Sequence, residues 1–316
     1  MSRLRNFLLV FLSLALLAGC QAPPPKDDQT LHILATTYPV YLFTTAVVGD
    51  TEGVEVELLV NSQTSCLHDY TLTVKDMKAI EQADVIVMNG VGLEDFMADA
   101  LARSNAAVVD CSENVALLPT LEHEDHDGHD HEEEYDPHYW MDPRRAAGMI
   151  AAISDGLAKI DPGRSDRYFL HEVTAYDKMG GLRQDMDAAL FQILTVTGKP
   201  TTEGLWNCDK LITFHDGFQY FADAFGLELL KAIEEEEGAT VSAAEIREIT
   251  ALIEENHIPA IFVEKSGSRK TADVIARETG CSVYELDMLM SGDGQGIQPY
   301  LDAIDKNLTT VLEAFS

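Results

Sequence analysis

Short apolar runs alternate with helix-compatible segments in two separate parts of the chain, and this alternation constrains the fold more than any other feature. The first part carries strand-like runs at 31–37, 54–60, 83–88 and 106–109. The second part carries such runs at 211–214, 260–263 and 282–286. Strands that alternate with helices favour parallel sheets covered on both faces. We therefore expect an α/β fold with two lobes.

A mostly helical segment separates these two parts. It runs over residues 143–194, with interruptions at Asp161-Pro162-Gly163 and Gly180-Gly181. Each mid-helix glycine costs roughly 1 kcal/mol relative to alanine, so the glycine pair indicates a kink or a helix boundary. The predicted organisation is a signal peptide (1–19), a tether (20–30), an N-terminal lobe (31–142) with an acidic loop (122–136), a linking helical segment (143–194) and a C-terminal lobe (195–316).

The first 30 residues are typical of an exported protein. Arg3 and Arg5 precede an apolar run from 7 to 18, and Leu17-Ala18-Gly19-Cys20 follows. The apolar run is shorter than the roughly 20 residues that a membrane span needs. Its end resembles a bacterial lipobox, in which Cys20 becomes lipidated. We expect a protein at the outer face of the cytoplasmic membrane, at the cell surface or in the periplasm, that touches the membrane only through this anchor.

The charge balance narrows the function classes. The chain has 54 acidic and 22 basic residues, a formal net charge of −32. So acidic a chain is a poor partner for nucleic acid or for anionic lipid. A cationic cargo is compatible with it.

Apart from Cys20, the chain has four cysteines: Cys66, Cys111, Cys208 and Cys281. An even number in an exported chain suggests two disulfides, for which three pairings exist. Because each predicted lobe holds two cysteines, the expected pairs are Cys66–Cys111 and Cys208–Cys281. No pair has the Cys-x-x-Cys spacing of structural zinc sites.

Three histidines and one aspartate lie in loops beside predicted strand ends or a helix start: His68, His138, His215 and Asp287. Ligands of open α/β sheets gather in crevices at the carboxyl ends of the strands. An isolated histidine at such a place is more often structural, and Asp287 alone is also compatible with a cap or an Asx turn. We interpret His32, His171 and His257 as structural.

The residue types select the metal if the four side chains converge. Imidazole nitrogens and one carboxylate suit tetrahedral zinc. Calcium and magnesium prefer oxygen ligands, manganese favours more carboxylate, and copper competes by affinity. Four protein ligands make a closed site that holds its ion. Without Asp287 the open position would suit a zinc hydrolase, although the sequence contains no HExxH motif.

The acidic loop is rich in histidine as well. Residues 122–136 hold nine carboxylates and four histidines: His123, His126, His129 and His131. Histidine-rich tracts bind transition metals, whereas the alternative is a solvated acidic linker. We expect weak auxiliary metal sites here.

Several motifs now make the chain recognisable. The run Asp136-Pro137-His138-Tyr139-Trp140-Met141-Asp142-Pro143 resembles the DPHxWxDP motif of the cluster A-I metal-binding proteins of ABC importers. The segment from Thr213 to Ala222 is similar to the TFHDAFxYFA segment of that family. Residues 261–264 with 276–280 resemble its IFxE…ARETG stretch, and 285–287 resemble its ELDPL. The resemblance extends from about Leu31 to the C-terminus.

The resemblance implies a fold and a function. It implies two α/β lobes with mainly parallel four-stranded sheets, bridged by a long helix, with metal bound between them. The chain would then be a monomeric, non-enzymatic binding protein that captures Zn²⁺ and hands it to the membrane permease of an ABC importer. The manganese-binding branch replaces the third histidine with glutamate, so His215 favours zinc. Manganese remains an alternative, a zinc-dependent hydrolase is a second one, and cell adhesion is only a label used in this family.

The chain departs from the family pattern near the first histidine. The motif that usually reads PHxYEPTPSD reads Cys66-Leu67-His68-Asp69-Tyr70-Thr71-Leu72-Thr73 here. Leu67 stands where some zinc-binding members carry a glutamate ligand. Asp287 is therefore the better fourth ligand under this resemblance, although Met288 rather than proline follows it.

Overall fold

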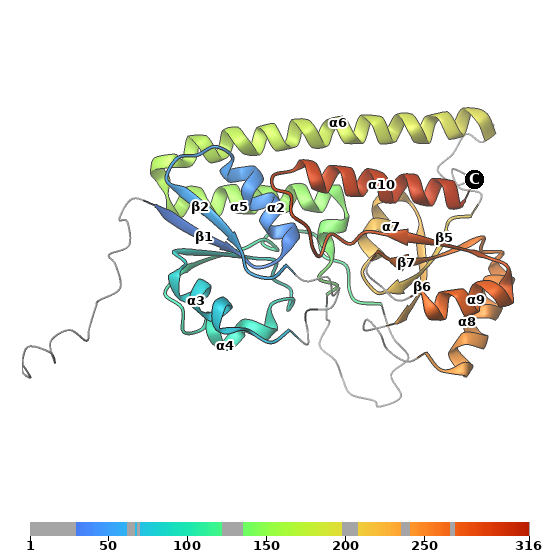
Figure 1. Ribbon diagram of the computed structural model, residues 1–316. Helices are drawn as coiled ribbons and strands as arrows, with labels where there is room; N and C mark the ends of the chain where they lie inside the picture. The colour runs from blue at the N-terminus through green and yellow to red at the C-terminus, as the bar shows by residue number, and fades with distance from the viewer. Residues whose placement is uncertain are drawn as a thin grey trace, which may run out of the picture.

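The computed structural model describes residues 30–61, 67, 70–121, 135–197, 208–234, 241–265 and 269–315, with the backbone alone at 182–197 and 234. The described chain forms two α/β lobes that lie side by side beneath one long helix (Figure 1). The two lobes and the parallel sheets confirm the predicted fold class.

The N-terminal lobe is built on a parallel four-stranded sheet of order β2-β1-β3-β4. Its strands are β1 (Leu31–Ala35), β2 (Val54–Leu58), β3 (Val85–Met88) and β4 (Ala107–Asp110). In the register, Ile33 pairs with both Val56 and Val85. Its helices are α2 (Tyr38–Val48), α3 (Val74–Gln82), the 3-10 turn η1 (Asp95–Met97) and α4 (Ala98–Leu101). A capping box between Thr73 and Asp76 fixes the start of α3.

The C-terminal lobe repeats this plan with a sheet of order β6-β5-β7-β8, again parallel. Its strands are β5 (Lys210–His215), β6 (Glu228–Glu234), β7 (Ala260–Glu264) and β8 (Ser282–Leu286), and its helices are α7 (Gln219–Phe225), α8 (Ala243–Asn256) and α9 (Lys270–Thr279). Strand β6 has no counterpart among the predicted elements. Its sequence, ELLKAIE, lacks the alternation that marks a strand, and its pairing with β5 creates it.

Three further helices lie in the described residues: α5 (Pro143–Ile160), α6 (Ser165–Thr197) and α10 (Gln298–Ala314), with the 3-10 turns η2 (Tyr139–Met141) and η3 (Pro162–Arg164) before α5 and α6. Helix α6 runs over both lobes, with α10 beneath it (Figure 1). Gly180 and Gly181 lie inside α6, which continues through them without a break. The segment predicted to link the lobes therefore contains two successive helices, of which α6 is the long one.

The stretch between β8 and α10 ties the lobes together. Asn61 and Gly292 exchange two hydrogen bonds, of 2.8 and 3.0 Å, between the side-chain amide and the backbone. The amide of Gly294 donates to the hydroxyl of Tyr38 at 3.1 Å. The rings of Phe43 and Tyr300 meet edge to face at 5.0 Å. The relative placement of the lobes is thus fixed by contacts between residues far apart in sequence.

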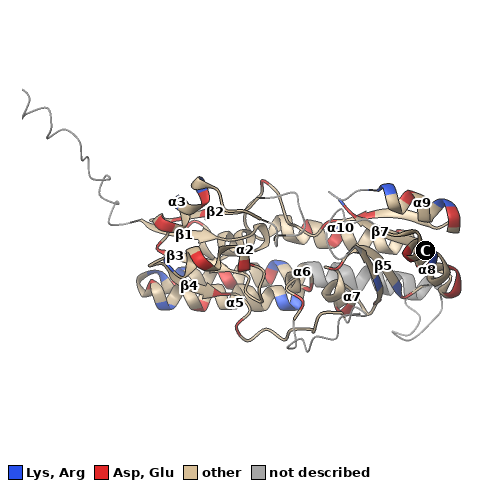
Figure 2. Cartoon of the chain, turned by 90° about the horizontal axis from the view of Figure 1, so that it is seen from below, with Lys and Arg blue, Asp and Glu red and all other residues tan. Residues whose placement is uncertain are grey.

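Acidic residues lie along elements of both lobes rather than on one face (Figure 2). None of the helices in the described ranges combines the length and the apolar character needed to cross a membrane.

Candidate metal centre between the lobes

His138 lies just before η2 in a buried and oriented position. The residue is 8% exposed, and its Nδ1 lies 2.8 Å from Oδ1 of Asp136. The same carboxylate oxygen accepts a hydrogen bond from the backbone amide of His138 at 2.8 Å. A carboxylate that holds one ring nitrogen fixes the tautomer, which leaves Nε2 with the lone pair that binds a metal.

The electrostatics of His138 follow from these neighbours. Burial alone would lower the pKa of His138, but the charge and hydrogen bond of Asp136 outweigh it. The carboxylates of Asp216 and Glu264 act in the same direction. The pKa of His138 is therefore raised, and this position favours a positive charge, either a proton or a cation.

His215 is the last residue of β5 and meets His138 from the other lobe. The two rings are perpendicular, with their centroids 5.3 Å apart. His215 is also buried, and its Nδ1 lies 3.6 Å from Oε1 of Glu264, which is 5% exposed at the end of the neighbouring strand β7. The carboxyl ends of two parallel strands, β5 and β7, thus supply this side of the site.

Trp140 contacts both His138 and the segment after β8. Its ring lies 5.2 Å from that of His138, and its Nε1 donates to the carbonyl of Met288 at 3.0 Å. The hydroxyl of Tyr300 donates to the carbonyl of Trp140 at 2.9 Å. Met288 also packs on Gly217, where an added Cβ would overlap with the Met288 side chain. A larger residue at position 217 would therefore require the Met288 side chain to move.

Asp287 follows β8 and has its own partners. Its Oδ1 accepts from the amide of Leu289 at 2.9 Å, and its Oδ2 lies 3.1 Å from Nζ of Lys265. Within the described ranges, no three His, Cys, Asp or Glu side chains lie together closely enough to hold a metal ion. The structure thus brings His138 and His215 together, while Asp287 forms an Asx turn and an ion pair.

Several predicted residues lie outside the described residues: His68, Cys20 and the loop histidines His123, His126, His129 and His131. The described neighbours of His68 are held firmly. Leu67 is 1% exposed and accepts a hydrogen bond from the amide of Tyr70 at 2.9 Å. The hydroxyl of Tyr70 in turn donates to Asp76 at 3.1 Å.

The histidines interpreted as structural lie elsewhere. His32 is near Glu55 on β2, at 3.6 Å, and His171 contacts Asp50 at 3.1 Å. His257 caps the end of α8 in a left-handed conformation, with φ of 53°.

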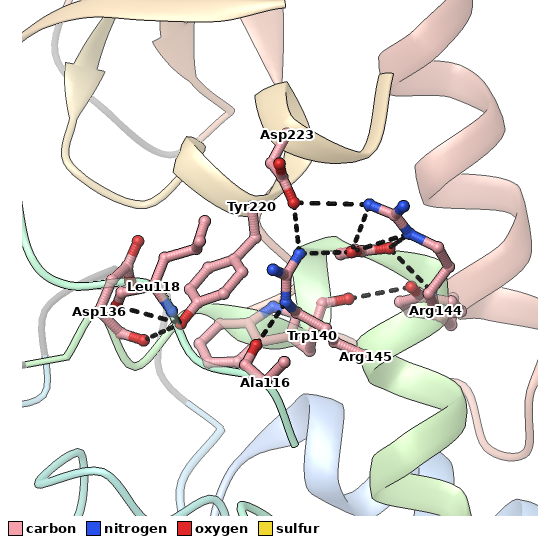
Figure 3. Close-up of polar contacts among 10 residues, drawn as sticks. Ala116, Leu118, Asp136, Trp140, Arg144, Arg145, Tyr220 and Asp223 are labelled. Atoms are coloured by element: carbon pink, nitrogen blue, oxygen red, sulfur yellow. Dashed lines mark hydrogen bonds and ion pairs between the residues drawn. The ribbon is translucent and has the colours of Figure 1, made fainter. Parts of the chain in front are cut away.

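A polar network connects the His138 loop to α7, the helix after His215 (Figure 3). The hydroxyl of Tyr220 accepts from the amide of Leu118 at 2.8 Å and donates to the carbonyl of Asp136 at 2.9 Å. Leu118 and Asp136 are themselves paired, the Asp136 amide donating to the Leu118 carbonyl at 3.0 Å. Tyr220 is therefore hydrogen-bonded to both chain segments that flank residues 122–134, one on each side.

Arg145 reinforces this connection. Its guanidinium lies over the ring of Tyr220, 4.7 Å from the centroid, and bonds Asp142 at 2.6 Å and Asp223 at 2.7 Å (Figure 3). Sequence reasoning missed these supporting residues, as it missed Asp136 and Glu264. For Asp136, its closeness to His138 in the sequence was an available indication of its role. Tyr220 and Glu264 contact their partners Asp136 and His215 from distant positions in the sequence, so no local pattern indicates their roles.

The predicted Cys208–Cys281 disulfide is wrong, because both thiols are free. The two cysteines precede β5 and β8, and β7 lies between these strands. Two strand spacings amount to about 9.5 Å, beyond the roughly 4.4–6.8 Å between the Cα atoms of a disulfide. Cys111 is likewise a free, buried thiol, and its predicted partner Cys66 lies outside the described residues. The structure therefore gives no support to the Cys66–Cys111 pair.

Comparison with known proteins places this geometry in context. The zinc-binding lipoprotein AdcA of Streptococcus pneumoniae serotype 4 is 29% identical over 316 aligned residues, which cover 96% of this chain. The chain spans only 59% of the length of AdcA. The high-affinity zinc uptake system protein ZnuA of Bacillus subtilis is 28% identical, with 92% of this chain and 88% of that protein covered.

The solved structures agree with the curated relatives. The Zn(II)-bound ZnuA-like domain of Streptococcus pneumoniae AdcA superposes with a TM-score of 0.70 at 26% identity, covering 90% of this chain and 99% of that domain. The family model of ZnuA, the periplasmic component A of the zinc-uptake complex, matches residues 33–314. Because this match covers nearly the whole chain, including both lobes and the histidine pair, the chain belongs to the ZnuA family of zinc-uptake components.

Proposed function

We propose that this protein captures zinc outside the cytoplasm and delivers it to the membrane permease of an ABC importer. The observation that carries the proposal is the pair of buried imidazoles, His138 and His215, which face each other from opposite lobes at 5.3 Å. The names of the relatives, zinc-binding lipoprotein AdcA and zinc uptake protein ZnuA, support zinc as the cargo.

The proposed ligand set is His68, His138 and His215, with Asp287 or water as the fourth ligand. Three imidazoles suit Zn²⁺, whereas Mn²⁺ favours more carboxylate, so the manganese alternative is disfavoured. The carboxylates near His138 offset the charge of a bound dication and keep the site selective for cations. The histidines of residues 122–134 are proposed as weak auxiliary sites that collect zinc.

The proposal includes no chemistry on the cargo. Binding and release are the whole task, so the site must hold the ion without activating a bound water for attack on a substrate. The alternative of a zinc hydrolase is disfavoured, because the matching family and the similar proteins are described as zinc-uptake and zinc-binding proteins. We further propose that Cys20 carries the lipid and that the protein acts as a monomer.

Competition titrations against a chromophoric zinc chelator test the proposal. The wild type should bind a single zinc tightly, and His138→Ala and His215→Ala should each weaken binding by more than the roughly 10–100-fold that loss of an outer partner costs. His257→Asn is the matched control, since asparagine tolerates the left-handed backbone at that position. Tight binding that survives both alanine variants would place the site elsewhere.

A further inference from the structure

Three large apolar side chains are exposed together near the start of α6. Phe169, Leu170 and Val173 are 63%, 52% and 39% exposed. They stand at positions i, i+1 and i+4 of one helix, so they share one side of it. Elsewhere in the described residues, exposed large apolar side chains occur singly or, on α3, as a pair. We call Phe169, Leu170 and Val173 the apolar patch.

The fold uses the other side of α6 for its own packing. Tyr168, Ala175 and Met179 are buried, and α6 packs against α2, α5 and α10. At 100° per residue, these three residues lie on nearly the opposite side of the helix from the apolar patch. The patch therefore adds nothing to the packing of the lobes and is available to a partner.

The polar residues around the apolar patch determine which partner suits it. Asp166 and Asp177 are exposed, and helical spacing places them on the same side as the patch, one before it and one after it. Arg167 lies on another side of the helix and is paired with Asp50. The patch is thus an apolar surface with a carboxylate at each end, which suits a neutral partner better than an anionic one.

The chain enters the fold close to the apolar patch. The amide of Leu31, the first residue of β1, donates to the carbonyl of Gly53 at 2.8 Å. Arg164, which directly precedes α6, donates from its Nε to the carbonyl of Glu52 at 3.0 Å. The starts of β1 and α6 thus contact adjacent residues at the same end of the molecule (Figure 1). The patch lies within about 12 Å of the start of α6 along the helix axis.

The length of the tether limits how far a lipid anchor lies from this end of the molecule. Ten residue steps separate Cys20 from Thr30. Even a fully extended chain spans at most about 3.6 Å per residue, so the tether reaches no further than roughly 36 Å. A lipid on Cys20 therefore keeps the bilayer surface within that distance of the apolar patch's end of the molecule. Tethering raises the effective concentration of the bilayer, so even a weak contact forms.

We propose that the apolar patch of α6 rests on the bilayer that holds the lipid anchor, so that the anchored protein lies with the start of α6 against the membrane. Aromatic and aliphatic side chains of such a helix bury themselves at the boundary between headgroups and acyl chains. Anionic headgroups repel the carboxylates of Asp166 and Asp177, so the surface that fits is a zwitterionic one. This inference rests on the proposed lipidation of Cys20 and adds an orientation to that anchoring.

Quenching of fluorescence by the lipid tests the proposal. The lipidated full-length protein is reconstituted at low density into phosphatidylcholine vesicles, with or without bromine on the acyl chains. Leu170→Trp places an indole in the apolar patch, and the wild type gives the background from Trp140 and Trp206. We expect brominated lipid to quench the added indole. Anionic phosphatidylglycerol in the vesicles should weaken this quenching.

Val74→Trp is the matched control, because Val74 is 74% exposed and lies on α3, on the other side of the N-terminal sheet from α6 (Figure 1). Its indole has the same affinity for lipid as one at Leu170 but should not be quenched. Adding Phe169→Gln and Val173→Gln to Leu170→Trp should lower the ratio of membrane-contacting to detached protein by about tenfold, on the scale of burying two partly exposed apolar side chains. Thermal unfolding checks that these surface changes leave the fold intact.

Absence of quenching in Leu170→Trp, or equal quenching in Val74→Trp, would overturn the proposal. Shielding of the apolar patch that appears only at high protein density would mean contact between two copies of the chain, and would overturn it as well. Flotation of the vesicles separates these results from a failure of the anchor. A wild type that does not float with the vesicles would refute the lipidation of Cys20 and this proposal with it, whereas zinc capture is measured independently in solution.

Discussion

The hydroxyl of Tyr220 donates to the backbone carbonyl of Asp136, 2.9 Å away, while the carboxylate of the same Asp136 holds the ring of His138. Tyr220 belongs to α7 and follows His215 by five positions. One tyrosine thus connects the supports of two proposed ligands that lie 77 positions apart, at 138 and 215. We expect the geometry of the histidine pair to depend on this connection.

Tyr220→Phe should weaken zinc binding and lower stability together. The change removes the partner of the partly buried Leu118 amide, and one hydrogen bond contributes about 1 kcal/mol, so we expect roughly fivefold weaker zinc binding. Tyr176→Phe is the matched control, because its hydroxyl bonds the carbonyl of Ala147 at 3.0 Å in the helical layer. Calorimetry and thermal unfolding check both, and equal zinc affinity in the two variants would contradict the coupling.

Asp136→Asn should reduce zinc affinity by about 10–100-fold, the usual cost of losing the outer partner of a ligating histidine. The asparagine side chain leaves no charge to hold the Nδ1 proton of His138, and the pKa of His138 should fall. Asp161→Asn, which changes a carboxylate paired with Arg164 at 2.8 Å, provides the comparison. Zinc titration with NMR of the His138 ring measures both effects, and an unaltered His138 pKa would count against this role of Asp136.

Zinc affinity should fall with decreasing pH, and the fall should begin above the ordinary histidine pKa of about 6.5. Protons and zinc compete for imidazole nitrogen, and the Asp136, Asp216 and Glu264 carboxylates raise the pKa of His138. The free energy of unfolding of the metal-free protein should change in the opposite direction. Because the pKa of His138 is raised in the folded state, its protonation stabilises the fold at low pH, and this contribution is lost as pH rises through the folded pKa. An affinity that stays constant from pH 7.5 to 5.5 would argue against a histidine shell.

Glu94 gives the metal-free protein a second pH dependence. Burial raises the pKa of Glu94 to about 7, although Thr36, Asn89 and Gly90 donate to its carboxylate. Since the folded pKa lies above the unfolded value of 4.5, the stability from protonated Glu94 is complete below pH 4.5 and is lost as pH rises through 7. Glu94→Gln should flatten the free energy of unfolding between pH 5 and 8, which urea titrations measure. An unchanged slope would locate the dependence in other groups.

Thiol labelling should separate the cysteines by burial. Cys208 and Cys281 are partly exposed free thiols, so iodoacetamide should modify both in the native protein. Cys111 is fully buried, and burial with the nearby Glu94 and Asp110 charges raises the pKa of its thiol, so it should react only after unfolding. Peptide mass mapping reads out each site. A Cys208–Cys281 cross-linked peptide would disprove the strand spacing described above.

Much of the fold follows from local patterns in the sequence. The runs that became β1, β3, β7 and β8 are apolar and short, and the capping residues Thr73 and Ser242 mark helix starts. Strand β6 was missed because ELLKAIE has no alternation and gains its conformation from pairing with β5. Gly180 and Gly181 suggested an interruption, but α6 continues through them because their intrinsic cost is small against a helix of 33 residues.

The site was predictable only in part. The histidines stand in recognisable local motifs, whereas the residues that hold them in place come from distant positions in the sequence. His138 and His215 carried enough sequence context to be expected in one site, and the structure places their ring centroids 5.3 Å apart. The Lys265 ion pair of Asp287 and the grip of Tyr220 on Leu118 join positions that no spacing rule connects. The prediction of a Cys208–Cys281 disulfide failed for the same reason, since a count of cysteines carries no information about the strand that separates two of them.

The placement of Trp140 gives the protein an intrinsic fluorescent reporter of the histidine pair. The chain has two tryptophans, at positions 140 and 206, so a Trp206→Phe variant would isolate the emission of Trp140. The indole lies 5.2 Å from the ring of His138 and is anchored to Met288 of the other lobe. Its fluorescence should therefore respond both to the charge of that imidazole and to separation of the lobes. Cargo loading and release become observable in real time, without any attached dye.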